Sequence, residues 1–99
     1  LDASTGRTGV RDNELLLRLL DAMQNDARFY FAGVQHSAGH VMHVPDFEKR
    51  RDKSMRAWER LADKFALLEQ RGMRPQIVTG GGTGTFDIDM IRQAFARFV

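Results

Sequence analysis

Helical patterns and short apolar runs alternate along the chain, and this alternation is the strongest constraint on its fold. The predicted elements, in chain order, are a strand end at 1–2, a helix at 11–26, a strand at 28–35, a helix at 47–72, a strand at 74–80 and a helix at 87–99. This order is typical of a parallel sheet with right-handed crossovers. The strand at 28–35 is apolar on both faces, which favours a strand buried on both sides.

Both long helices have recognisable start and stop signals. Asp12 or Asn13 can cap the first helix, Asp46 can cap the second, and Gly72 can end the second in the left-handed conformation. The apolar spacing predicts these buried faces: Leu16, Leu19, Leu20 and Met23 in the first helix, and Met55, Trp58, Leu61, Ala62, Phe65 and Leu68 in the second.

Composition excludes several classes of protein. With 99 residues, 42% of them hydrophobic, the chain fits one small globular domain or a piece of a larger one. No run reaches the ~18 apolar residues of a membrane span. Cysteine is absent, which excludes disulfide frameworks and thiolate metal sites and favours a reducing, cytoplasmic setting. Acidic residues flank the basic run at 49–51, so we expect a solvated helix face and no nucleic-acid partner.

Glycines and threonines crowd the junction "TGGGTGT" at residues 79–85. Bare backbone between a strand and a helix exposes several amides and lets an anion approach closely. A tight turn that only needs positive φ is the alternative. No Lys follows the glycines, as a P-loop requires, and the dinucleotide pattern lacks its last glycine because Thr85 stands there. We therefore expect a single phosphate monoester here, as in pyridoxal phosphate or a sugar phosphate.

All three strand-to-helix junctions carry unusual residues, and in a parallel sheet they share one rim. The stretches are "DASTGRTGV" at 2–10, "FAGVQHSAGH" at 31–40 and "VTGGGTGTF" at 78–86. In this order and spacing they resemble the D-threonine aldolase and D-serine dehydratase family. These are fold-type III pyridoxal 5'-phosphate (PLP) enzymes related to the barrel domain of alanine racemase. The resemblance implies that residues 1–99 are about three βα units of a (β/α)8 TIM barrel.

The resemblance also implies a PLP site on this rim. The residues that would bind the cofactor are Arg7, Gln35, His36, Thr79, Gly81, Gly82, Thr83, Gly84 and Thr85. Arg7 would face the pyridine nitrogen and keep it unprotonated, because a guanidinium cannot accept a proton. Without the resemblance, a surface loop arginine is the favoured interpretation of Arg7. His40, which matches the family's Gly-His pair, is the catalytic candidate, and a hydrogen-bonded loop histidine is the alternative reading.

The three histidines predict no metal site of their own. His36, His40 and His43 would suit a metal only on a helix, and Gly39 and the loop context argue against one. In the family, a divalent metal is held by a later C-terminal domain. Two positions depart from the family pattern: Ser4 replaces a usual glycine, and Ser37 replaces an aromatic residue of many D-threonine aldolases.

The family's Schiff-base lysine lies on the first barrel strand, upstream of Leu1. Because the chain does not begin with Met, we expect an excised segment, and because it lacks that lysine we expect it to be inactive alone. Its lysines on the second helix, Lys49, Lys53 and Lys64, cannot substitute. We expect the segment to need the rest of its barrel or other copies of itself, because it would leave sheet edges open.

Three functional hypotheses follow from these residues. The first is part of a PLP-dependent enzyme that acts on D-amino acids by retro-aldol cleavage, dehydration or racemisation, as a homodimer at full length. The second is a non-enzymatic module that binds PLP or a phosphorylated metabolite. The third is a structural role in which the glycines serve packing alone.

Overall fold

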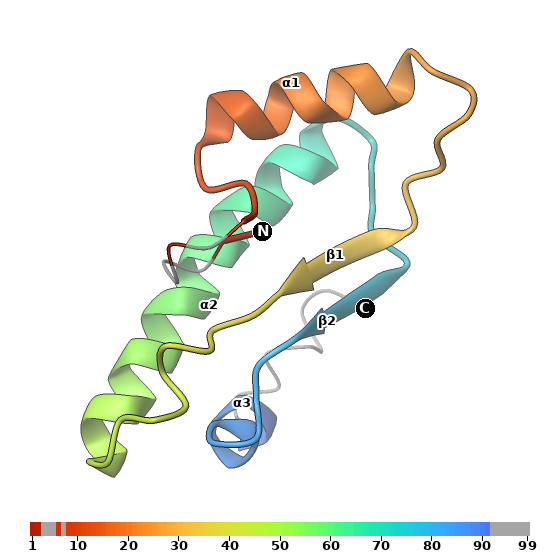
Figure 1. Ribbon diagram of the computed structural model, residues 1–99. Helices are drawn as coiled ribbons and strands as arrows, with labels where there is room; N and C mark the ends of the chain where they lie inside the picture. The colour runs from red at the N-terminus through yellow and green to blue at the C-terminus, as the bar shows by residue number, and fades with distance from the viewer. Residues whose placement is uncertain (3–5, 7, 92–99) are drawn as a thin grey trace.

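The computed structural model describes residues 1, 2, 6 and 8–91 and has the predicted alternation of helices and strands (Figure 1). Its elements are α1 (Asn13–Gln24), β1 (Gly33–His36), α2 (Phe47–Gln70), β2 (Ile77–Gly80) and α3 (Phe86–Ile91). The order therefore confirms an α/β chain. Arg7, Ser4 and the predicted helix beyond residue 91 lie outside the described residues.

The two strands form a parallel pair that runs in register from Gly33↔Ile77 to His36↔Gly80. The predicted strand end at Leu1 and Asp2 is confirmed as a parallel neighbour of β1. Asp2 bridges Ser37, and the Leu1 amino group donates a hydrogen bond to the Gln35 carbonyl at 2.7 Å. Figure 1 shows the N-terminus beside β1 on the edge away from β2.

Capping residues define the ends of both long helices, as the sequence predicts. Asp12 accepts a hydrogen bond from the Glu14 amide at 2.6 Å, and Asp46 accepts one from the Lys49 amide at 2.8 Å. Beyond α2, Gly72 has φ 66°. Each cap satisfies backbone groups that would otherwise have no partner at a helix end.

The helices cover one face of the sheet. Leu16 and Leu20 of α1 form a core cluster with Leu68 and Met73, and Val34 of β1 packs against it. The buried residues of α2 are Ser54, Ala57, Trp58, Leu61 and Leu68. The prediction that Leu19 is buried is wrong: Leu16 and Leu20 are the residues of α1 that are buried in this cluster, and Leu15 and Leu19 stay about half exposed. None of the described helices combines the length and apolarity needed to cross a bilayer.

The opposite face of the sheet is open within the part of the chain that the structure describes. Side chains alternate along a strand, so Gln35, Ile77 and Thr79 lie on this face and are exposed. The prediction that β1 starts near residue 28 and is buried on both faces is wrong. The chain is still turning there, because the Phe29 amide bonds to the Asp26 carbonyl at 3.1 Å.

Candidate functional site

The candidate site lies where the two strands end. His36 and Gly80 are paired partners at the C-terminal ends of β1 and β2, and the bridge from Asp2 to Ser37 brings the first junction to the same edge. The described parts of the three junctions therefore share one rim. In open α/β sheets and in barrels, ligands bind at this rim.

We use the name glycine loop for residues 81–85, which connect β2 to α3. The loop begins with Gly81 at φ 75° and closes with a turn in which the Thr85 amide bonds to the Gly82 carbonyl at 3.0 Å. No hydrogen bond between described residues engages the N–H groups of Gly82, Thr83 or Gly84. Thr83 is exposed, so its hydroxyl is free to meet a ligand. The loop thus offers neutral hydrogen-bond donors at the rim.

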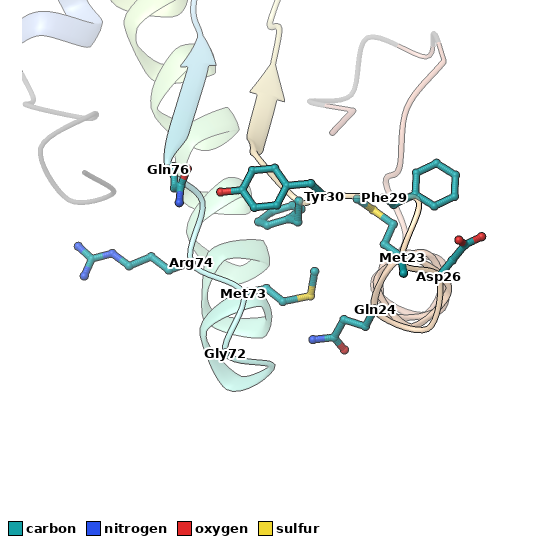
Figure 2. A pocket seen from close by; sticks show the side chains of 11 residues that line it. Met23, Gln24, Asp26, Phe29, Tyr30, Gly72, Met73, Arg74 and Gln76 are labelled. Atoms are coloured by element: carbon teal, nitrogen blue, oxygen red, sulfur yellow. The ribbon is translucent and has the colours of Figure 1, made fainter.

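The loop borders a cavity of about 280 Å³. The residues that line it are Gly80, Gly82, Thr83, Phe86, Asp89 and Met90. A second cavity, of about 360 Å³, lies at the other ends of the strands, and the residues that line it include Tyr30, Met73 and Gln76 (Figure 2). Although the second cavity is larger, it lies away from the rim that carries the glycine loop, so we place the candidate site at the smaller one.

Close packing explains why glycines occupy the loop and its approach. A Cβ at Gly82 would lie 2.1 Å from the Met42 sulfur, and one at Gly84 would lie 2.5 Å from the Met42 carbonyl oxygen. A Cβ at Gly80 would lie 2.5 Å from the His36 carbonyl oxygen. Each of these glycines therefore has a steric reason of its own. The number of glycines therefore does not argue for a ligand. The argument rests on the three amides that have no partner in the described part of the chain.

Asp89 is the site residue that sequence reasoning missed. Its carboxylate is 3% exposed and accepts hydrogen bonds from the Ser54 hydroxyl, the Trp58 indole and the Thr85 hydroxyl, each at 2.8 Å. The Thr85 hydroxyl, predicted to bind the cofactor, therefore faces the protein interior. The four-residue spacing from Thr85 to Asp89, on one face of a helix, was the available signal.

Gln35 and His36, which the sequence analysis placed together beside the cofactor, lie on opposite faces of the sheet. Gln35 pairs in register with Thr79, and both side chains are exposed on the open face. His36 points to the helices and is 2% exposed, with its ring 5.4 Å from the Trp58 ring. A strand's alternation cannot bring neighbouring side chains to one face.

Burial determines the charge of His36. Neither ring nitrogen makes a hydrogen bond to a described residue. Burial lowers the pKa of the imidazole to about 4, because the charged form loses its hydration there. The ring is therefore neutral at pH 7 and acts as part of the packing beneath the rim.

The loop after β1 keeps its other two histidines exposed. Val41 and Ala38 of this loop pack with Ala57 of α2, which anchors the loop. His40 and His43 are on its exposed side. In the ranges that the structure describes, no group of three or more His, Asp or Glu side chains could hold a metal ion.

Fold and site together define a parallel α/β protein with an amide-lined, glycine-rich rim at the ends of its strands. No protein-family model matches the chain. The chain is 31% identical over 86 residues to a 3-hydroxy-D-aspartate aldolase of Paracoccus denitrificans (strain Pd 1222), a match that covers 87% of this chain and 22% of that protein. It is 34% identical over 89 residues to a D-threonine aldolase of Arthrobacter sp, covering 90% of this chain and 24% of that protein.

A solved structure agrees with these relatives. The crystal structure of D-threonine aldolase from Filomicrobium marinum matches with a TM-score of 0.85 and 30% identity, over 95% of this chain and 26% of that one. The resemblance to the D-threonine aldolase-like family, which three junction motifs indicated, is confirmed. The chain spans about a quarter of the length of these relatives.

Proposed function

We propose that the chain is part of a PLP-dependent aldolase that cleaves D-3-hydroxy amino acids, and that the glycine loop binds the phosphate of the cofactor. The observation that carries this proposal is the set of N–H groups of Gly82, Thr83 and Gly84 at the rim, which have no hydrogen-bond partner among the described residues. Both named relatives and the solved neighbour are aldolases, which supports retro-aldol cleavage over dehydration or racemisation.

The residues of the loop fit a phosphate monoester. Backbone amides and the Thr83 hydroxyl are the donors that phosphate groups take at glycine-rich turns. Among the described residues that line the cavity, Asp89 is the one that is ionisable, and its two oxygens are turned inward to three donors. Its charge faces the interior of the protein.

When bound, PLP supplies an electron sink that allows a bond at the substrate α-carbon to break. Gln35 and Thr79 lie side by side on the open face of the sheet, so we assign them to hydrogen bonds that orient the ring or its substituents. His40 stays the candidate for proton transfer, because an imidazole can both donate and accept a proton. Arg7 stays a prediction of the family resemblance.

The remaining expectations concern the protein at full length. We propose that the chain forms about three βα units of a (β/α)8 barrel whose other units cover the open face of the sheet. A homodimer and a divalent metal held outside this chain, both implied by the family, belong to the same proposal. The open face, with Ile77 58% exposed, supports the presence of a covering layer.

The experiment uses the protein at its natural full length. We expect added PLP to give the visible absorbance band of the enzyme-bound cofactor, and D-threonine to be cleaved to glycine and acetaldehyde. L-threonine is the matched control and should not react. Binding of PLP without cleavage of either isomer would favour the binding-module hypothesis, and the absence of PLP binding would refute the proposal.

Thr83 tests the loop itself. Replacing Thr83 with Ala removes an exposed hydroxyl and leaves the loop's packing glycines in place. We expect the dissociation constant for PLP to rise by about tenfold or more, the effect of one hydrogen bond to a charged group. The dissociation constant for pyridoxal, which has no phosphate, should not change. Equal effects on both ligands would place the phosphate elsewhere.

A further inference from the structure

The glycine loop rests directly on the carboxylate of Asp89. A Cβ at Gly81 would lie 2.5 Å from Asp89 Oδ2, so the backbone of the loop passes against this oxygen. The same oxygen accepts the Thr85 hydroxyl at the other end of the loop. Both ends of the loop therefore meet one buried oxygen atom.

The second oxygen of Asp89 holds the helix beneath the rim. Oδ1 accepts hydrogen bonds from Ser54 and Trp58, both on α2. Trp58 in turn lies under the strand ends: its ring contacts the His36 ring, and a Cβ at Gly80 would lie 3.4 Å from it. One side chain thus connects the loop, α3 and α2 at the point where both strands end.

We propose that Asp89 is a positioning residue that fixes the glycine loop in the conformation presenting the amides of Gly82, Thr83 and Gly84 to a phosphate. This inference rests on the proposed phosphate site. The charge of Asp89 cannot itself attract a phosphate, because two negative charges repel each other. The three donors that converge on Asp89 are neutral and hold its carboxylate in place. Asp89 therefore acts on the loop through its position. Removing the carboxylate would leave three inward-facing donors without their acceptor.

Two variants of Asp89 separate geometry from charge. Asp89→Asn keeps an acceptor for Ser54 and Trp58 and presents an amide to the Thr85 oxygen, so the loop should stay in place. Asp89→Ala removes the acceptor for all three donors. Leu20→Ala is the matched control: Leu20 is 2% exposed in a core cluster that the glycine loop does not join, so its loss destabilises the protein without touching the loop.

The first readout needs no ligand. In the full-length apoprotein, hydrogen exchange is followed at the Thr85 amide, which closes the loop on the Gly82 carbonyl. We expect Asp89→Ala to speed this exchange by about tenfold or more, the factor for losing hydrogen bonds to a charged group. Asp89→Asn and Leu20→Ala should leave it near the wild-type rate. If Asp89→Ala does not fold, Ser54→Ala removes one donor and should speed exchange by about threefold.

The second readout is the ratio of the dissociation constants for pyridoxal and PLP. We expect Asp89→Ala to lower this preference for the phosphorylated ligand by about tenfold or more, and Asp89→Asn and Leu20→Ala to keep it.

The inference is overturned if the Thr85 amide exchanges no faster in Asp89→Ala, or in Ser54→Ala in its place, than it does in Leu20→Ala. It is also overturned if Asn and Ala at position 89 lose the phosphate preference equally. If the wild-type protein shows no preference for PLP, the phosphate site fails, while the exchange data still decide whether Asp89 positions the loop.

Discussion

The buried imidazole of His36 shows how the environment of a single residue sets its chemistry. The ring lies against Trp58 and is shielded from water, and burial lowers its pKa to about 4. In the unfolded chain the same imidazole has its ordinary pKa of 6.5. The folded state therefore prefers the neutral form, and acid favours unfolding.

His36 should make stability depend on pH in a defined window. Between about pH 6.5 and 4 the unfolded state binds the proton and the folded state does not, so stability is complete above this window and falls as the pH is lowered through it. The loss is at most about 3 kcal/mol. Urea unfolding at pH 7 and pH 4.5 measures it. In His36→Leu this contribution should vanish, whereas the exposed-residue control His43→Gln should keep it; an unchanged pH dependence in His36→Leu would contradict the assignment.

Gly82 tests the packing argument for the glycines. An Ala at this position would place a methyl group 2.1 Å from the Met42 sulfur, so we expect Gly82→Ala to destabilise the apoprotein by about 1–3 kcal/mol. Met42→Ala shortens the neighbouring side chain. In the Met42→Ala background, Gly82→Ala should therefore cost less stability than it does in the wild-type protein. Thermal unfolding of the four proteins gives the coupling. Additive losses would show that the two residues do not meet.

At the scale of elements, sequence pattern predicts the helices better than the strands. Caps and periodicity locate α1 and α2 to within two residues at each end, because Asp12, Asp46 and Gly72 act locally. The strand at 28–35 shrinks to Gly33–His36, because the Asp26 turn extends to Phe29 and strand pairing depends on a partner far along the chain. The residue types within a strand do not indicate which distant segment will pair with it.

Some features of the candidate site could likewise be predicted from local sequence, and others could not. The position of the glycine loop at a strand end follows from its glycines and threonines, which are a local signal. The separation of Gln35 from His36 follows from strand alternation and was available from the sequence. The spacing from Thr85 to Asp89 is a local signal, whereas the contacts of Asp89 with Ser54 and Trp58 join residues 31 and 35 positions apart and are identified by the folded arrangement.

The cap of α2 offers a prediction at this scale. Asp46→Ala removes the acceptor for the Lys49 amide and should lower the free energy of unfolding by about 1 kcal/mol. Asp63→Ala, an exposed position within the same helix, is the control and should change stability by less than about 0.5 kcal/mol. Denaturant titration compares them, and equal losses would show that the cap contributes nothing specific.

For the whole molecule, the uncovered surface is the main physical problem. Large apolar side chains stand exposed at the ends and open face of the sheet: Phe29, Tyr30, Ile77, Phe86 and Met90. β2 also presents a strand edge without a partner among the described residues. Exposed edges and apolar patches pair with other chain segments when nothing covers them.

We therefore expect residues 1–99, produced alone, to associate. Sedimentation velocity at micromolar concentration should show oligomers or aggregates, while the full-length protein gives discrete species. Substituting Ile77 with Lys, on the open face, should reduce the association by placing a charge there. A monomeric 99-residue chain that melts cooperatively would contradict this expectation and the barrel proposal behind it.

The proposed function depends on the amides of the glycine loop binding the phosphate of PLP. A crystal structure of the full-length protein with PLP would show where the phosphate lies. We expect phosphate oxygens within hydrogen-bonding distance of the N–H groups of Gly82, Thr83 and Gly84, with Asp89 still held by Ser54, Trp58 and Thr85. A phosphate bound away from these amides would contradict it.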